Sequence, residues 1–244
     1  MESVLEVDGL KVHFPVKKGF FARTVGYVKA VDGVSFSLAR GETLGIAGES
    51  GSGKSTLARA IVSLVKPTQG SIRATGRVSM VFQDPLGSLN PRQSVGEIIG
   101  TVPRGMKKPD VAALLGEVGL PLSAADKYPH EFSGGERQRV CIARALAVEP
   151  EILVCDEAVS ALDLSIRSQV LDLLSRLKRD RSLSMLFITH DLGVVAHFCS
   201  RMIVMRSGVV VEEGDPKEVL RAPAHEYTRR LVDSILHVGG GEGS

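Results

Sequence analysis

The chain has 244 residues, 43% of them hydrophobic, and its 30 basic residues nearly balance its 28 acidic ones, for a net charge of +2. No apolar run approaches the ~20 residues of a membrane-spanning helix, and residues 1–6 lack the basic and apolar regions of a signal peptide. We therefore expect one large cytosolic domain, with or without a subdomain, and no general affinity for nucleic acid. The widely spaced Cys141, Cys155 and Cys199 are expected to be reduced, buried thiols.

The first predicted elements are two short strands near the N-terminus. Residues 34–38 alternate apolar and polar side chains, which is typical of a half-buried antiparallel strand, and residues 4–7 could pair beside it. We interpret residues 17–24, between them, as an irregular loop.

The most specific pattern of the chain follows a short apolar run, Thr43–Ala47, that predicts a buried strand. The next nine residues match G-x-x-x-x-G-K-S/T at every fixed position and are called the phosphate loop here: Gly48, Glu49, Ser50, Gly51, Ser52, Gly53, Lys54, Ser55 and Thr56. Residues 57–65 predict a helix that Pro67 ends.

Such a loop lets backbone N–H groups and a helix N-terminus converge on phosphate oxygens. We expect Lys54 to reach the β- and γ-phosphates and the Ser55 hydroxyl to ligate Mg²⁺. A flexible Gly/Ser loop is the alternative, but the strand–loop–helix context favours binding of a nucleoside triphosphate.

Three later apolar runs, at residues 78–82, 152–155 and 185–188, predict strands covered on both faces. Such strands form a mostly parallel sheet with helices on each side, which is an α/β fold. A polar residue follows each run, in turn Gln83, Asp156 and His190. Ligands bind at the C-terminal edge of such sheets, so we expect these three residues to converge near the phosphate loop.

Two further segments carry candidate chemistry. Asp156 and Glu157 follow a buried strand, where the first carboxylate can hold Mg²⁺ and the second can orient an attacking water. An acidic turn is the alternative, although the neighbouring phosphate loop favours the functional interpretation. Ser133 and Glu136 form a capping box that starts a helix, and Gly134 and Gly135 leave its N-terminus bare. That bare helix start is a second anion site, which two copies packed head to tail would use on each other's nucleotide.

The remaining pattern is less specific. Residues 85–131 predict a mostly helical insertion, and the apolar stripe after Ser165 predicts an amphipathic helix. Residues 201–211 predict a hairpin around Ser207-Gly208, and residues 239–244 a flexible tail.

Together these motifs resemble the nucleotide-binding subunit of an ABC transporter, in order and spacing, over essentially the whole chain. The resemblance implies a phosphate-loop NTPase core with a mostly parallel sheet, an N-terminal antiparallel β-subdomain and an inserted helical subdomain at about residues 85–150, all within a domain of residues 1–238. It also implies that ATP and Mg²⁺ are the cofactors.

The resemblance assigns roles residue by residue. Gln83 is similar to the glutamine that ligates Mg²⁺ and senses the membrane subunit, and Glu157 to the catalytic carboxylate. Asp163, at the end of the segment 160–163, is similar to the aspartate that communicates across the dimer. His190 is similar to the switch histidine on the γ-phosphate, whereas considered alone it is an ordinary loop histidine.

The sequence departs from the family pattern at three places. Phe132 and Glu136 stand where Leu and Gln are commonest, and Ala158 replaces the usual proline after the two acids, which predicts a looser turn. The aromatic that stacks on adenine is predicted to be Phe14, with Tyr27 as the alternative.

Residues 81–92 and 225–229 resemble the ATPases of oligopeptide, dipeptide and nickel importers. The implied partners are a second, identical or paralogous ATPase subunit, two permease subunits and, indirectly, an extracytoplasmic binding protein, with no nucleic acid. The implied location is peripheral, on the cytoplasmic face of a bacterial or archaeal inner membrane. The cysteine-containing C-terminal extension of many members has no counterpart here, so a shorter branch and half of a tandem fusion both stay open.

Two other classes of function are weighed against this one. A soluble ABC-type ATPase acting on ribosomes or nucleic acid usually carries two ATPase units or a long coiled-coil insertion. A nucleotide kinase would use the phosphate loop alone and would not need Ser133-Gly134-Gly135.

Overall fold

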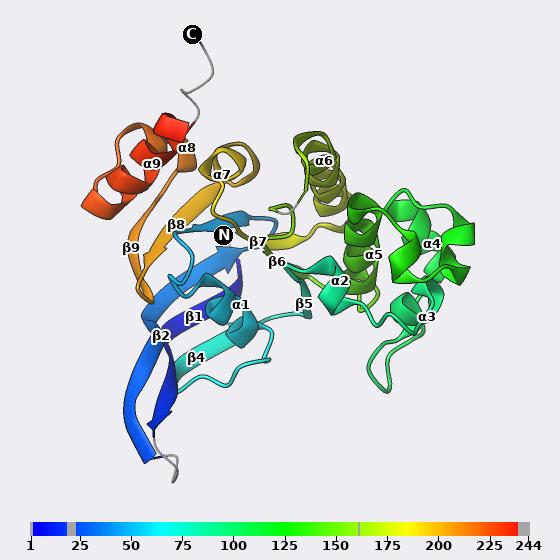
Figure 1. Ribbon diagram of the computed structural model, residues 1–244, viewed down its shortest axis with the longest axis horizontal. Helices are drawn as coiled ribbons and strands as arrows, with labels where there is room; N and C mark the ends of the chain where they lie inside the picture. The colour runs from blue at the N-terminus through cyan, green and yellow to red at the C-terminus, as the bar shows by residue number, and fades with distance from the viewer. Residues whose placement is uncertain (1, 19–22, 161, 239–244) are drawn as a thin grey trace. The chain divides into compact units, whose positions relative to one another are not determined.

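The computed structural model describes residues 2–18, 23–160 and 162–238 (Figure 1). The chain divides into two compact units, Met1–Thr75 with Phe187–Ser244, and Gly76–Leu186. The architecture is mixed α/β, as predicted, and each unit is described by itself.

The first unit contains the N-terminal strands, the phosphate loop and the C-terminal helices. Its elements are β1 (Ser3–Lys18), β2 (Arg23–Ala39), β3 (Thr43–Ala47), α1 (Lys54–Ile61), β4 (Gln69–Ala74), α7 (Leu192–Phe198), β8 (Arg201–Arg206), β9 (Val209–Gly214), α8 (Pro216–Arg221) and α9 (Glu226–Val238). The second unit contains β5 (Val78–Val81), α2 (Pro85–Ser88), α3 (Val95–Gly100), α4 (Val111–Glu117), the 3₁₀ turns Leu122–Asp126 and Pro129–Glu131, α5 (Gly134–Leu146), β6 (Ile152–Asp156) and α6 (Leu164–Arg181). Strand β7 (Ser184–Ile188) runs from the second unit into the first.

An antiparallel sheet in the order β2-β1-β4 begins the first unit. Leu5 pairs with Leu38 and Val7 with Phe36, which confirms the predicted pairing of residues 4–7 with 34–38. All six residues of β4 are exposed or partly exposed, so the strand has no buried face and its sequence carries no periodic apolar signal. Local sequence patterns therefore do not predict β4.

The expectation of a loop at residues 17–24 is wrong at both of its ends. Lys17 pairs with Thr24, and Lys18 with Arg23, so the β1–β2 ladder extends well beyond the core. This part of the ladder has mostly exposed side chains, and its sequence therefore lacks the alternation that marks a half-buried strand. Residues 19–22 lie outside the described residues.

Strands β3, β8 and β9 form the second layer of strands in this unit, with β3 and β8 parallel and β8 and β9 antiparallel. All five residues of β3 are buried, as its apolar run predicts. The predicted hairpin around Ser207-Gly208 is confirmed, and both turn residues have positive φ, at 49° and 84°. Two consecutive left-handed residues are typical of the turn that suits the twist of a tight hairpin.

Helix α1 differs from the predicted helix at both ends. It begins at Lys54, inside the phosphate loop, and it ends at Ile61 rather than running on to Pro67. Ser63 has a φ of 61°, and this left-handed residue turns the chain out of the helix before the proline is reached.

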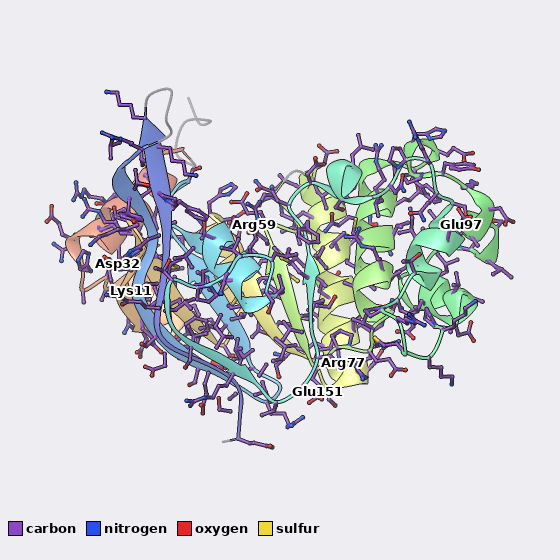
Figure 2. All side chains as sticks on the ribbon, turned by 90° about the horizontal axis from the view of Figure 1, so that it is seen from below. Lys11, Asp32, Arg59, Arg77, Glu97 and Glu151 are labelled. Atoms are coloured by element: carbon purple, nitrogen blue, oxygen red, sulfur yellow. The ribbon has the colours of Figure 1, made fainter. Side chains whose placement is uncertain are left out.

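In the second unit β5 and β6 pair in parallel, within one residue of the predicted runs. Figure 2 shows Arg77 and Glu151 side by side just before these strands, where the Glu151 N–H donates to the Arg77 carbonyl at 2.9 Å. The region of residues 85–131 contains α2, α3, α4 and the 3₁₀ turns, as predicted. That residues 85–150 form a separate inserted subdomain stays a prediction, and the predicted tail at 239–244 lies outside the described residues.

Candidate nucleotide site

The phosphate loop is a glycine-dependent turn between β3 and α1. Gly48, Gly51 and Gly53 have φ values of 148°, 80° and 105°, which side-chain-bearing residues rarely adopt. A Cβ on Gly48 would lie 2.3 Å from the carbonyl oxygen of Met205, and one on Gly53 would lie 2.1 Å from that of Ala30. Glycine is therefore required at both ends of the loop by conformation and by space.

Lys54 is 4% exposed and lies inside the curl of the loop. Its ammonium donates to the carbonyl oxygens of Gly48 and Glu49 at 2.7 and 2.8 Å, and to the Ser52 hydroxyl at 3.3 Å. A buried ammonium ringed by oxygen acceptors at the start of a helix is suited to exchange some of these acceptors for phosphate oxygens. This geometry fits the predicted role of Lys54, and it places Ser55 in the same first helical turn.

Two contacts from distant segments fix the loop, and the sequence analysis missed both. The Gly208 N–H donates to the Ser52 carbonyl at 2.9 Å, and the Asp32 N–H donates to the Gly208 carbonyl at 2.8 Å. The Glu49 N–H donates to the hydroxyl of Tyr227 at 3.0 Å. The sequence indicates Ser207-Gly208 only as a hairpin turn, and the segment 225–229 only as part of the resemblance to importer ATPases.

His190 is exposed just beyond β7, and its neighbours on both sides are fixed within the first unit. Thr189 is fully buried, and its N–H donates to the Ile46 carbonyl of β3 at 3.2 Å. Asp191 caps α7 by accepting from the Val194 N–H at 3.1 Å. The strand end and the helix cap thus hold the backbone of His190 close to the strand that leads into the phosphate loop.

In the second unit, two of the predicted residues are in direct contact. The Gln83 amide nitrogen donates to the Glu157 carboxylate at 2.9 Å. Glu157 has a φ of 48°, a left-handed value that is uncommon for a residue with a side chain and tends to occur at functional sites. Asp156, at the end of β6, is 2% exposed, so the two consecutive acids have very different environments. Ala158 is buried, and the predicted looseness of its turn stays untested.

The capping box at the start of α5 is confirmed. The Ser133 hydroxyl accepts from the Glu136 N–H at 3.3 Å, and the Glu136 carboxylate accepts from the Ser133 N–H at 2.9 Å and from its hydroxyl at 2.8 Å. These hydrogen bonds from the Ser133 backbone and side chain stabilise the ionised carboxylate and hold the pKa of Glu136 below its usual value.

The two glycines of this helix start have different surroundings. A Cβ on Gly135 would lie 2.6 Å from Cγ2 of Ile166, whereas one on Gly134 would be 3.9 Å from the nearest atom, in Leu162. Gly134 is exposed and Gly135 is buried. Gly135 is thus required for packing against α6, while Gly134 keeps the helix N-terminus open.

Three further predicted site residues are exposed, namely Asp163, Phe14 and Tyr27. Asp163 is the N-cap residue of α6, yet among the described residues its side chain makes no capping hydrogen bond, and Leu164 beside it is 77% exposed. Phe14 and Tyr27 lie on the extended β1–β2 ladder, 42% and 63% exposed. Both aromatics are accessible to a base, and the choice of Phe14 stays a prediction.

The predicted magnesium ligands supply only oxygen: the Ser55 hydroxyl, the Gln83 amide oxygen and the Asp156 carboxylate. This donor chemistry fits Mg²⁺, which prefers oxygen ligands. The amide nitrogen of Gln83 is the atom bonded to Glu157, so its amide oxygen is the atom that would serve as a ligand. That Gln83, Asp156 and His190 meet the phosphate loop at one site stays a prediction. Within the described ranges, no helix is both long and apolar enough to span a bilayer.

Comparison with known proteins identifies the class of this site. Residues 31–160 match the family model described as ABC transporter. A match over half of the chain shows that the chain belongs to the ABC transporter family, as an ATP-binding cassette.

Two curated relatives place the chain more closely. It is 46% identical to the oligopeptide transport ATP-binding protein OppF of Escherichia coli strain K12, covering 95% of this chain and 77% of that protein. It is also 46% identical to the oligopeptide transport ATP-binding protein AppF of Bacillus subtilis strain 168, covering 96% of this chain and 78% of that protein. Both support the resemblance to oligopeptide importer ATPases.

Solved structures show the same fold. The cbiO1 protein of Clostridium perfringens, described as part of the ABC transporter complex cbiONQ, has a TM-score of 0.74 and 28% identity over 98% of both chains. The ATP-binding cassette MJ0796, as a dimer in a post-hydrolysis state with ADP and Pi, has a TM-score of 0.73 and 28% identity, covering 87% of this chain and 98% of that chain.

Proposed function

We propose that the chain is the ATP-hydrolysing, energy-coupling subunit of an ABC importer for peptides or metal chelates. The observation that carries the proposal is that one chain has two helix N-termini suited to phosphate. One is α1 behind the phosphate loop, and the other is α5 behind Ser133 and Gly134. A chain that binds one triphosphate in its loop has a use for the second site only against the nucleotide of another subunit.

Binding of ATP begins at the phosphate loop. The Lys54 ammonium, already surrounded by oxygen atoms, exchanges loop carbonyls for the β- and γ-phosphates. Phe14 stacks on adenine, a contact worth ~1–3 kcal/mol that adjusts affinity rather than creating it. When bound, Mg²⁺ neutralises charge on the β- and γ-phosphates, with Ser55, Gln83 and Asp156 to hold it.

Hydrolysis then depends on residues that position water. The Glu157 carboxylate orients and polarises the attacking water, and the Gln83 amide keeps that carboxylate in place before nucleotide arrives. His190 contacts the γ-phosphate and senses its loss. Ser133 and Gly134 of a second subunit complete the site, and Asp163 lies at the same subunit interface. Closure of two subunits around ATP and their reopening after hydrolysis drive the membrane subunits.

The proposed cargo and partners are supported by similarity to importer ATPases. OppF and AppF are both named as oligopeptide transport ATP-binding proteins. A further relative, 45% identical, is the glutathione import ATP-binding protein GsiA of Salmonella choleraesuis strain SC-B67, of which the match covers 41%. These names favour peptide-like cargo. By resemblance to importer ATPases, we further propose two permease subunits, a substrate-binding protein outside the membrane and peripheral attachment at the cytoplasmic face.

Uptake and co-purification test this proposal. Deletion of the chain should abolish uptake of labelled oligopeptides or of nickel chelates, and the unmodified chain should restore uptake while Lys54→Ala should not. A tagged Glu157→Gln chain, purified from membranes with ATP, should bring two permease subunits with it.

The soluble ABC-type ATPase is the alternative that this experiment addresses. Recovery of the tagged chain with ribosomes or DNA, together with normal uptake in the deletion strain, would contradict the importer. Purification of an active monomer that transfers phosphate to a nucleotide would instead indicate a kinase.

A further inference from the structure

The C-terminal helix α9 touches the phosphate loop through one side chain. The hydroxyl of Tyr227, in the first turn of α9, accepts the N–H of Glu49 at 3.0 Å, across a sequence separation of 178 residues. Glu49 is the second residue of the phosphate loop, and both residues belong to the first unit. Figure 1 shows α8 and α9 beside β8 and β9, and these two strands carry residues that hold Tyr227 and the start of α9 in place.

The ring of Tyr227 is held firmly, so its hydroxyl has a defined position. The side chain is 4% exposed and packs in an apolar cluster that includes Ala47, the residue before the phosphate loop. The Arg206 guanidinium lies over the ring at 5.0 Å from its centre, a favourable cation–π arrangement. Burial of the ring and this cation restrict the tyrosine to one orientation, which aims the hydroxyl at the loop.

The start of α9 is itself fixed to β9. The Glu212 carboxylate accepts the N–H groups of Ala224 and His225 at 2.8 and 3.0 Å. The Tyr227 N–H donates to Nδ1 of His225 at 3.0 Å, which closes the turn that leads into the helix. These contacts anchor the support that carries Tyr227, so the contact with Glu49 joins the phosphate loop to a rigid part of the unit.

Glu49 is the residue at which holding the backbone of the loop matters. Its N–H is bound by Tyr227, while its carbonyl accepts from the Lys54 ammonium at 2.8 Å and from the Ser52 N–H at 3.2 Å. A rotation of the peptide that carries the Glu49 N–H would disturb the start of the loop, next to the acceptors of Lys54. Tyr227 therefore restrains the conformation that Lys54 and the loop N–H groups need in order to receive phosphates.

We propose that Tyr227 is a positioning residue for phosphate binding, and that its hydroxyl couples α9 to the phosphate loop. This inference rests on the proposed function, because it assumes that the loop binds ATP. Preorganisation lowers the conformational cost of binding, so the hydroxyl should strengthen binding of nucleotides that carry a β-phosphate. Coupling is reciprocal, so nucleotide in the loop should in turn stabilise the first turns of α9.

The test compares Tyr227→Phe with the unmodified chain in direct nucleotide binding. The ring and its packing are retained, so the apo protein should unfold within a few degrees of the unmodified chain. The Kd for ADP and ATP should rise roughly 3- to 10-fold, the scale of one hydrogen bond, while the Kd for AMP should stay within two-fold. Tyr128→Phe is the matched control, because Tyr128 lies in the second unit, is 42% exposed and belongs to no assigned site.

Hydrogen exchange supplies a second readout that a purely structural role would not move. ADP should slow amide exchange in residues 226–234 of the unmodified chain and of Tyr128→Phe, and this protection should be largely lost in Tyr227→Phe. Unchanged ADP affinity, or equal weakening of ADP and AMP, would overturn the inference and leave the proposed function standing. Failure of the unmodified chain to bind ATP or ADP would overturn the proposed function and this inference together.

Discussion

At the scale of single residues, the hydrogen bond between Gln83 and Glu157 is the contact most directly related to the proposed hydrolysis. The Gln83 amide nitrogen lies 2.9 Å from the Glu157 carboxylate, and the backbone of Glu157 has a left-handed conformation. A strained residue with an engaged side chain is poised for one task, since alternative rotamers would forfeit the hydrogen bond. The environment of Glu157 therefore favours a positioned base over a solvated surface acid.

Changing Glu157→Gln should leave ATP binding intact and slow hydrolysis by ~10²–10⁴-fold, because the amide cannot polarise water as the carboxylate does. The variant should accumulate as an ATP-bound dimer, visible by size-exclusion chromatography with ATP and absent with ADP. Glu213→Gln, a change of the same type at an exposed position on β9, should have normal turnover. Normal turnover of Glu157→Gln would remove Glu157 from the mechanism.

At position 136 the chain differs from the common family pattern in charge, because the acidic Glu136 stands where the neutral Gln is commonest. The Glu136 carboxylate accepts from the backbone N–H and hydroxyl of Ser133, which lowers its pKa, and like other glutamates it is ionised at neutral pH. In the proposed dimer, the Ser133 hydroxyl would have to leave this carboxylate before it could donate to the γ-phosphate of the other subunit. The negative charge of Glu136 also opposes that phosphate.

Glu136→Gln should therefore promote closure of the dimer. Glutamine preserves the acceptor of the capping box, so α5 should still form and lose only the small contribution of the charge. The ATP concentration that half-saturates dimer formation should fall about two- to five-fold, the scale of one exposed charge pair, and this gain should shrink at high salt. Light scattering during an ATP titration measures dimer formation. A higher half-saturating ATP concentration for Glu136→Gln than for the unmodified chain would contradict the proposed repulsion.

At the scale of elements, local patterns predicted β3 and the phosphate loop well. The burial of the strand and the conformation of the loop both depend on residues that are adjacent in the sequence. Local patterns failed where the structure depends on contacts distant in sequence. Strand β4 and the outer part of the β1–β2 ladder have no buried face, so hydrogen bonding alone defines them. The contact of Tyr227 with Glu49 joins residues too far apart for any periodicity to indicate.

The turn of the β8–β9 hairpin is the element-scale support of the phosphate loop. Gly208 donates to Ser52 and has a φ of 84°, and a Cβ there would lie 2.8 Å from the Lys29 carbonyl oxygen. Gly41 has a similar φ of 71° but nothing within 4 Å of a Cβ. A side chain at either glycine would strain the backbone to a similar degree, but only at Gly208 would its Cβ also clash with a neighbouring atom.

Gly208→Ala should lower both stability and nucleotide affinity, whereas Gly41→Ala should lower stability only. The strain of alanine at positive φ costs about 1 kcal/mol in both variants, and the clash adds about 1–2 kcal/mol in Gly208→Ala by pushing the hairpin off Ser52. Urea unfolding and ADP titration measure the two effects. Equal ADP affinity in the two variants would show that the hairpin does not position the loop.

At the scale of the whole molecule, the two helix starts that we propose to bind phosphate imply that a functional site needs two subunits. The exposed Ser133 and Gly134, and the exposed Asp163 and Leu164, are available for such a partner. ATP-binding cassettes solved as dimers have the same fold as this chain. Packing decides which substitution can test the start of α5. Gly135 lies against Ile166, so its substitution would disturb the packing of α6 directly.

Gly134 is the better position, since a Cβ there has room and an acidic residue in the first helical turn suits the helix dipole. Gly134→Asp should leave folding and ATP binding by the monomer unchanged, yet should abolish ATP-driven dimerisation and hydrolysis through repulsion of the γ-phosphate of the other subunit. Gly134→Ala, the uncharged control, should retain most activity. Mixing Gly134→Asp with Lys54→Ala should restore activity to at most one composite site per dimer, which pairs the intact phosphate loop of one chain with the intact α5 start of the other. Normal hydrolysis by Gly134→Asp, in a preparation whose activity rises with protein concentration as dimerisation requires, would reduce the α5 start to an ordinary helix cap.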